Sequence, residues 1–315
     1  MAISKCLSLS NENKINSISA SPMSKIDETG LQGSADFPVA VYLDDVTNDY
    51  VNWHWHKEFE FGFVVEGSVN VGCGTRKYIL KSGDIFFVNS DILHSMYNND
   101  PPNTSVFKSI TFDGSVIAGN TDSIFYTKYL APILSNNSLR DFAWKPNDNN
   151  YSRLISMISN IWDAVYSETP DYEITVRNEL SNIFRILIHL PENVSYDNND
   201  SNYIQENRVQ LMLNYIHTHY REKITLNDLA QIASVSKTEA MRSFKSIIGQ
   251  SPIKYLKNHK LQNAAYMLKN TNYSIGQICE ICGFDDNSYF SKSFREMYHC
   301  TPGEFRGICD DYSEL

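Results

Sequence analysis

The feature that most constrains this chain of 315 residues is an internal repeat near its C-terminal end. Arg242-Ser243-Phe244-Lys245 recurs fifty residues later as Lys292-Ser293-Phe294-Arg295, and Ser251-Pro252 recurs as Thr301-Pro302 at the same offset. Self-similarity at a fixed period indicates that one structural unit is encoded twice. Because the pattern between Val209 and Phe305 is helical, we expect two copies of a small helical unit.

Each copy carries the start signals of two short helices with a tight turn between them. The turns are expected at Ser234-Val235 and at Gly283-Phe284. The expected helix-capping pairs, three residues apart, are Thr225 with Asp228, Ser236 with Glu239, and Ser274 with Gln277. Two short helices joined in this way are typical of a helix-turn-helix unit. A longer helix from Pro252 to Asn270, roughly 27 Å at about 1.5 Å per residue, would separate the two units by nearly the ~34 Å between successive major grooves.

The distribution of charge separates this block from the rest of the chain. The net charge is −10, from 27 basic and 37 acidic residues, and this average argues against a nucleic-acid-binding protein. Residues 206–306, however, carry 13 basic and 9 acidic side chains, a balance of +4, so the remainder carries −14. The basic block and the acidic remainder therefore have different expected partners.

The acidic part reads as short strands followed by two helices. Strands are expected at the ranges 39–46, 60–65, 68–73, 77–80, 84–89 and 105–111, separated by turn residues, which is typical of an antiparallel barrel or sandwich. Helical periodicity begins near Ser152 and ends at Pro191. The expected fold class is α+β, with an N-terminal antiparallel β-barrel and its helices followed by an all-α tandem helix-turn-helix domain.

This pattern predicts six segments. They are a flexible tail at 1–36, a barrel at 37–150, a helical packing or dimerisation segment at 151–191, an Asn/Asp-rich linker at 192–205, the tandem helix-turn-helix domain at 206–306 and a tail at 307–315. No apolar run approaches the roughly 20 residues of a membrane span, and the first ten residues do not resemble a secretory signal. The six cysteines are scattered, so we expect reduced thiols, a cytoplasmic location and no membrane partner.

A cluster of histidines and carboxylates marks the first barrel strands. In an extended strand from His54 to Glu60, alternate side chains share one face. This alternation predicts that His54, His56, Glu58 and Glu60 project together, and His94 follows after the turn at Gly83. The four side chains, with His94, are the candidate effector-binding residues.

The C-terminal block resembles the DNA-binding domain of AraC/XylS-type transcription regulators, in which one long helix joins two helix-turn-helix units. The resemblance covers residues 206–306 and rests above all on Ser274-Ile275, Gly283-Phe284, the run from Ser288 to Lys292, Phe294-Arg295 and Thr301-Pro302. His299 stands where the family usually has glycine, whereas the first copy keeps Gly249. The resemblance implies DNA contacts by Lys237, Thr238, Met241, Arg242 and Lys245 in the first unit, and by Asn287, Ser288, Ser291, Lys292 and Arg295 in the second. Phe244, Tyr289, Phe290 and Phe294 are assigned to the core.

The histidine cluster resembles the two motifs of the cupin barrel, although Asn89 and Asp91 stand where the second motif usually carries proline and glycine. Metal-binding cupins hold an ion with the residue types found here at His54, His56, Glu60 and His94, whereas related sensor domains often bind an organic effector instead. The interpretation favours the latter, with no metal and no cofactor, and leaves the four-residue metal site open as the alternative.

The two resemblances together imply a regulator, and not an enzyme. It would be an activator that responds to a small molecule such as a carbohydrate. Its partners would be double-stranded promoter DNA, the effector, RNA polymerase and a second copy in a homodimer. The competing hypothesis is a metal-dependent cupin enzyme, an isomerase or dioxygenase, that uses the same four residues.

Overall fold

The computed structural model describes residues 33–34, 36–47, 50–190 and 200–313. The chain divides into two compact units, one extending to Asn202 and the other from Tyr203 onward. Each unit is described by itself. The predicted tail at 1–36 lies almost entirely outside the described residues, as does most of the predicted linker at 192–205.

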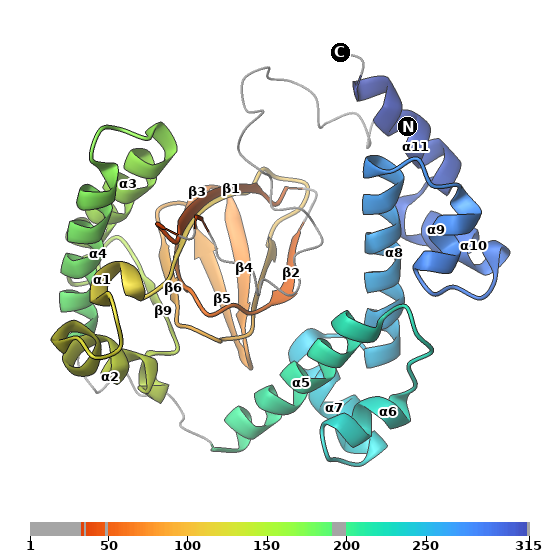
Figure 1. Ribbon diagram of the computed structural model, residues 1–315, viewed down its shortest axis with the longest axis horizontal. Coiled ribbons are helices and arrows are strands. Elements are labelled where there is room, and N and C mark those ends of the chain that lie inside the picture. The colour runs from red at the N-terminus through yellow and green to blue at the C-terminus, as the bar shows by residue number, and fades with distance from the viewer. Residues whose placement is uncertain (1–32, 35, 48–49, 191–199, 314–315) are drawn as a thin grey trace. The chain divides into compact units, whose positions relative to one another are not determined.

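The first unit contains two antiparallel sheets (Figure 1). One sheet has the order β1-β8-β3-β6-β9 and the other has the order β2-β7-β4-β5. The strands are β1 (Val39–Asp45), β2 (Tyr50–His54), β3 (Phe59–Glu66), β4 (Ser68–Cys73), β5 (Arg76–Lys81), β6 (Ile85–Val88), β7 (His94–Asn98), β8 (Val106–Phe112) and β9 (Asp141–Trp144).

Alternation along β3 explains why the two faces of the larger sheet have separate cores. Phe59 and Phe61 point to one side, where they join a cluster with residues of the two long helices. Val64 points to the other side and packs with Val69, Val71 and Phe107 between the sheets. The Phe107 ring lies so close to Gly62 that a Cβ there would be only 1.9 Å from it, so glycine is required at this position.

Helices cover the outer face of the larger sheet. Short elements come first: α1 (Ser115–Ala118), the π-helical turn η3 (Tyr126–Leu130), α2 (Ala131–Leu134) and the 3-10 turn η4 (Asn137–Leu139). The long helices α3 (Tyr151–Ser167) and α4 (Tyr172–Ile188) then pack against each other and, through Leu154, Ile158 and Leu180, on the sheet (Figure 1).

The mixed fold class expected from the sequence is confirmed, with two corrections. The nine described strands form two separate sheets and not a closed barrel. The extended strand predicted from His54 to Glu60 is also wrong, because β2 ends at His54, β3 begins at Phe59, and the two strands belong to different sheets. The patterns missed β2, β7 and β9, which are only four or five residues long.

The second unit is helical, and the fifty-residue sequence repeat corresponds to two similar pairs of helices within it. Its helices are α5 (Asp200–His219), α6 (Leu226–Ile232), α7 (Lys237–Ile248), α8 (Pro252–Asn270), α9 (Ile275–Ile281), α10 (Asn287–Tyr298) and α11 (Pro302–Ser313). The second helices of the two helix-turn-helix units, α7 and α10, have equal length and are offset by fifty residues. Helix α5 begins six residues before the predicted boundary at 206, and α11 continues through most of the predicted tail at 307–315.

Local signals account for the helix boundaries of this unit. Thr225 with Asp228 and Ser274 with Gln277 form reciprocal capping boxes, and Ser236 caps α7, as predicted. Helix α7 ends at Gly249 and α10 ends at His299, and both residues have left-handed backbone conformations, with φ of 81° and 61°. The second copy therefore places a histidine in a conformation that favours glycine.

Candidate effector site and DNA-binding surface

The predicted histidine and carboxylate cluster is assembled from both sheets of the first unit. His54 and His94 are paired across β2 and β7 of the smaller sheet, with ring centroids 4.0 Å apart. Glu60 reaches them from β3 of the larger sheet, and His56 comes from the segment that connects β2 to β3. One ligand atom from each of these four residues lies within 4.8 Å of all the others.

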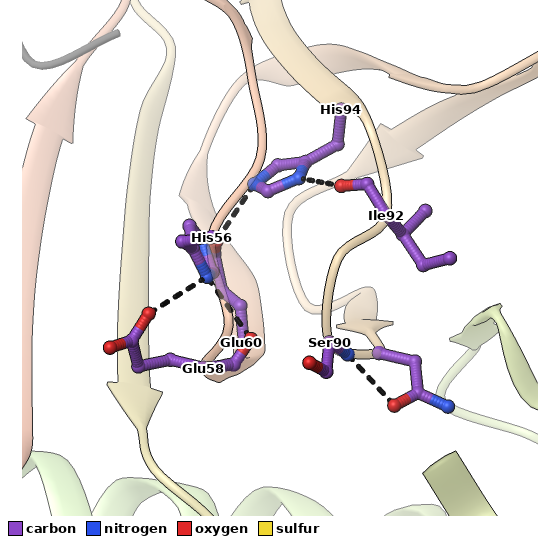
Figure 2. A network of polar contacts seen from close by, with 7 residues as sticks. His56, Glu58, Glu60, Ser90, Ile92 and His94 are labelled. Carbon is purple, nitrogen blue, oxygen red and sulfur yellow. Dashed lines mark hydrogen bonds and ion pairs between the residues drawn. The ribbon is translucent and has the colours of Figure 1, made fainter. Parts of the chain in front are cut away.

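The main chain orients all three imidazole rings. Nδ1 of His54 donates to the carbonyl of Asn52 (2.8 Å), Nδ1 of His56 to that of Glu58 (3.0 Å), and Nδ1 of His94 to that of Ile92 (2.8 Å; Figure 2). Because a carbonyl oxygen can only accept, each Nδ1 must carry the proton, and in a neutral ring Nε2 is then left with a lone pair. Hydrogen bonds of this kind are typical of histidines that ligate metal ions.

The contacts of Glu60 require positive charge at the centre of the cluster. Its Oε2 lies 3.3 Å from Nε2 of His56 and 3.1 Å from Nε2 of His94. Two acceptor atoms repel at such distances unless a second ring proton or a cation lies between them. Burial alone would raise the pKa of Glu60, but its interactions with His56 and His94 outweigh burial and hold the pKa well below its usual value. Burial lowers the pKa of His54, and the neighbouring His94 and His56 lower it further.

The loop that presents His94 forms without the usual proline and glycine. Asp91 adopts a left-handed conformation with φ of 61°, as a glycine there would, and its N–H donates to the carbonyl of His56 (2.8 Å). The buried Asn89 amide donates to the carbonyls of Ile133 and Leu139, at 2.9 Å each. The two sequence departures therefore leave His94 in place.

The space beside the cluster is small. A cavity of about 30 Å³ lies beside three of the clustered residues, His54, His56 and Glu60. The other residues that line it include Tyr42, Asp44, Met96, Ser109 and Thr111. This volume is far below the roughly 300–1,000 Å³ of typical pockets for organic ligands. The apolar side chains Phe86, Phe107 and Met96 fill the rest of the space between the sheets. The side chains thus leave little open space beside the four clustered residues.

Glu58 stands apart from the other four candidate effector residues. It is buried, and its Oε2 lies 3.6 Å from Nδ1 of His56, on the side of the ring that faces away from Glu60. The ligand cluster does not include it. Its place in the connecting segment, and not in a strand, removes the alternation that grouped it with Glu60.

In the second unit, the five candidates of the first recognition helix share one surface. Lys237, Thr238, Arg242 and Lys245 are exposed and Met241 is partly exposed, while Phe244 is fully buried. All five candidates line an open hollow of about 640 Å³ along α7, together with Leu226 and Ser246. The helix thus presents a polar, basic face opposite its buried one.

The candidates of the second recognition helix are arranged in the same way on α10. Asn287, Ser288, Lys292 and Arg295 are exposed, and Ser291 is partly exposed. Phe290 and Phe294 are buried as predicted, but the assignment of Tyr289 to the core is wrong, since this residue is 54% exposed. The buried face of α10 is formed by Phe290, Ser293 and Phe294, and Tyr289, one position before Phe290, lies off that face.

Comparison with known proteins agrees with both halves of this description. A family model described as an AraC-like ligand binding domain matches residues 37–188, and one described as a helix-turn-helix domain matches residues 229–308. The chain belongs to the AraC-type transcription regulators. It contains a ligand-binding domain and a helix-turn-helix DNA-binding domain.

The relatives of this AraC-type regulator are themselves regulators. The uncharacterized HTH-type transcriptional regulator YdeC of Bacillus subtilis is 25% identical over 276 residues, which cover 87% of this chain and 93% of YdeC. The Msm operon regulatory protein of Streptococcus mutans is 25% identical over 250 residues, 78% of this chain and 82% of the relative. A crystal structure of ToxT from Vibrio cholerae O395 is 14% identical, covers 88% of this chain and 99% of that chain, and has a TM-score of 0.42.

Sequence reasoning about the regulator missed a contact on its DNA-binding face. Arg242 donates to Oε2 of Glu239 (2.5 Å), and Oε1 of Glu239 accepts from the buried Ser243 hydroxyl (3.1 Å). The spacing of three residues between Glu239 and Arg242 is a signal for such a pair. Since the Arg242 side chain is 75% exposed, the pair costs little to break when the guanidinium turns to another acceptor.

None of the helices in the described parts of the regulator combines the length and the hydropathy that a membrane span requires. Cys279 and Cys282, which resemble half of a zinc motif, are buried in the core of the second unit among Ile278, Phe290 and Phe294. They serve there as small apolar residues.

Proposed function

We propose that the protein is a cytoplasmic bacterial regulator, and not an enzyme, whose two recognition helices read two adjacent major-groove segments of promoter DNA. The observation that carries this proposal is the in-register duplication of α7 and α10, each with one buried apolar face and one exposed polar face. Arg242 has the donors to read guanine O6 and N7, and Asn287 has those to read adenine. Lys237, Lys245 and Arg295 supply phosphate contacts.

Selection from a random DNA pool tests this proposal. The full-length protein is expected to enrich a bipartite site whose halves lie about one helical turn apart. Substitution Arg242→Ala is expected to relax base preference in one half only, and Asn287→Ala in the other half. Enrichment of no common sequence by the wild-type protein would contradict the proposal.

We further propose that the effector of the first unit is a divalent transition-metal ion, held by His54, His56, Glu60 and His94. The residues fit such an ion because three oriented imidazoles and one carboxylate converge, and because the Glu60 contacts call for positive charge at their centre. Two ligand atoms at about 2.1 Å from one ion are roughly 3.4 Å apart in a tetrahedral site and roughly 4.2 Å apart across an octahedral one, so the ligand atoms, which lie within 4.8 Å of one another, must move closer together when the ion binds. The small 30 Å³ cavity supports an ion over a carbohydrate.

Metal binding is measured by elemental analysis and by titration of the metal-free protein with Zn²⁺, Mn²⁺ and Ni²⁺. The wild type is expected to bind one ion per chain, and Glu60→Gln and His94→Ala are expected to bind at least tenfold more weakly. Glu66→Gln is the matched control, because Glu66 lies on the same strand but is exposed. Equal binding by Glu60→Gln and Glu66→Gln would exclude this site, and tight binding of a sugar instead would restore the organic effector.

We also propose that the regulator is a homodimer that activates transcription by recruiting RNA polymerase once it occupies its site. Exposed apolar side chains on the two long helices of the first unit, Tyr166 on α3 and Ile174 on α4, support an interface there. The 63% exposed Ile174 offers the test. Sedimentation of Ile174→Glu is expected to give a monomer where the wild type gives a dimer, and an unchanged mass would place the interface elsewhere.

A further inference from the structure

The second unit contains a buried lysine that touches both helix-turn-helix units. Lys260 lies in the middle of α8 and is only 8% exposed. Its ammonium donates to the carbonyl of Gly283 (2.6 Å) and to that of Glu222 (3.4 Å). Glu222 precedes α6 of the first helix-turn-helix unit, whereas Gly283 forms the turn between α9 and α10 of the second.

The same two segments also meet directly, main chain against main chain. A Cβ on Gly283 would lie 2.2 Å from the carbonyl oxygen of Arg221, and the φ of Gly283 is +70°. Only glycine permits this approach, because any side chain would collide with backbone that cannot move aside. The segment between α5 and α6 is therefore packed against the turn between α9 and α10 of the second helix-turn-helix unit.

These contacts matter because helix α8 is otherwise the main link between the two helix-turn-helix units. Helix α8 runs between the pair α6–α7 and the pair α9–α10 (Figure 1). If α8 were the only connection, each helix-turn-helix unit could rotate about its end of this helix, and the angle between α7 and α10 would vary. Hydrogen bonds from one buried ammonium to a main-chain carbonyl of each helix-turn-helix unit restrict that rotation. Buried charged groups are costly unless they are paired in this way, so the arrangement is strongly specified.

We propose that Lys260 is a positioning residue for DNA recognition: with the carbonyls of Glu222 and Gly283 it forms a clasp that sets the spacing and angle between α7 and α10. Lys260 does not touch DNA, although its place in a basic block would suggest a phosphate contact. A preorganised pair of recognition helices loses less conformational freedom on binding. It also discriminates against half-sites at the wrong separation. This inference rests on the proposed two-helix reading of DNA.

The test compares two DNA duplexes, the bipartite site selected by the wild-type protein and the same site with one base pair inserted between its halves. The insertion moves the second half by about 3.4 Å and turns it by about 35°. Full-length wild type is expected to bind the inserted duplex at least tenfold more weakly than the original. Lys260→Met, which keeps most of the side-chain volume and loses the donors, is expected to reduce this ratio to threefold or less, mainly by weaker binding to the original site.

Two further variants separate the clasp from a general loss of charge or of structure. Lys269→Met removes the same charge from an exposed position in the last turn of α8, and it is expected to keep the wild-type ratio. Lys260→Arg keeps a cationic donor and is expected to retain most of the ratio. If Lys260→Met does not fold by circular dichroism, Lys260→Gln, which keeps one N–H donor group, replaces it with the same expected reduction.

The outcomes distinguish the clasp from the function on which it rests. A folded Lys260→Met or Lys260→Gln protein with the wild-type ratio would overturn the clasp while leaving DNA binding intact. A wild-type protein that selects no bipartite site would overturn the proposed function itself.

Discussion

Two buried histidines predict that the helical unit loses stability in mild acid. His259 on α8 is 4% exposed and His217 on α5 is 9% exposed, and their ring centroids are 4.9 Å apart. Tyr255 and Tyr220 are the other ring neighbours, and the Asn263 amide donates to Nε2 of His259 (3.2 Å). Burial lowers the pKa of His259 to about 4, and it also lowers the pKa of His217.

The sign and size of the effect follow from proton linkage. Because the pKa of His259 is lower in the folded protein than the usual 6.5, the unfolded chain binds more protons between these values. The contribution of neutral His259 to stability is thus complete above pH 6.5 and is lost as the pH falls toward 4. The difference in pKa corresponds to about 3 kcal/mol in full, of which about 2 kcal/mol is lost between pH 7.5 and pH 5. His217 adds to the loss in the same direction.

Urea unfolding of the full-length protein at the two pH values measures this loss. All four tryptophans, Trp53, Trp55, Trp144 and Trp162, lie in the first unit, so their fluorescence follows that unit alone. Far-ultraviolet circular dichroism follows the helices of both, and the difference between the two signals isolates the second unit. His259→Gln keeps an acceptor for Asn263 and is expected to reduce the pH dependence by about 2 kcal/mol.

The control is His219→Gln, a change at a partly exposed histidine on the same helix as His217, which is expected to keep the wild-type pH dependence. Two results would refute the reasoning. One is a wild-type loss below about 0.5 kcal/mol, and the other is a His259→Gln protein that loses as much stability as the wild type.

Further predictions concern the DNA-binding face and the helix ends. Arg242→Ala is expected to lose about 1–3 kcal/mol of discrimination at one base pair, measured by competition with single-base variants of the selected site; an unchanged base preference would remove Arg242 from the reading face. Lys245→Ala is expected to weaken binding to all duplexes about equally and to lower the salt slope by about 1, so a sequence-dependent loss would argue against a phosphate contact. His299→Gly is expected to stabilise the protein by about 1 kcal/mol in thermal unfolding, because it relieves a left-handed conformation. Its counterpart Gly249→Ala, with φ of 81° and open space around the new Cβ, is expected to destabilise it by a similar amount, and opposite signs would refute the conformational argument.

The helical unit could be predicted almost entirely from the sequence, because its signals are local. A capping serine or threonine and its partner lie three residues apart, so Thr225, Ser236 and Ser274 mark their helices without knowledge of any distant residue. The fifty-residue repeat then doubled each signal. The exception is Tyr289, which was expected in the core but is exposed beside the buried Phe290.

The strand unit was harder to predict, because its pairings join distant residues. Strands β2 and β7 are five residues each, too short for a clear alternation, and they are stabilised mainly by partners elsewhere in the chain. Alternation through 54–60 grouped His54, His56 and Glu60, which do lie together, but it also included Glu58, which does not join them. His54 and Glu60 do meet, but they meet across two sheets, with a break between them, and not along one strand.

By itself, then, the sequence determined the residue types of the site and the duplicated helix-turn-helix units, since composition, spacing and helix caps are properties of short segments. Only the tertiary structure decided how much open space lies beside the site, because the 30 Å³ volume depends on how Phe86, Phe107 and Met96 from three strands pack between the sheets. It also decided the contacts of Lys260. A lysine in a basic block is expected to contact DNA, but the fold places main-chain carbonyls from both helix-turn-helix units beside its ammonium.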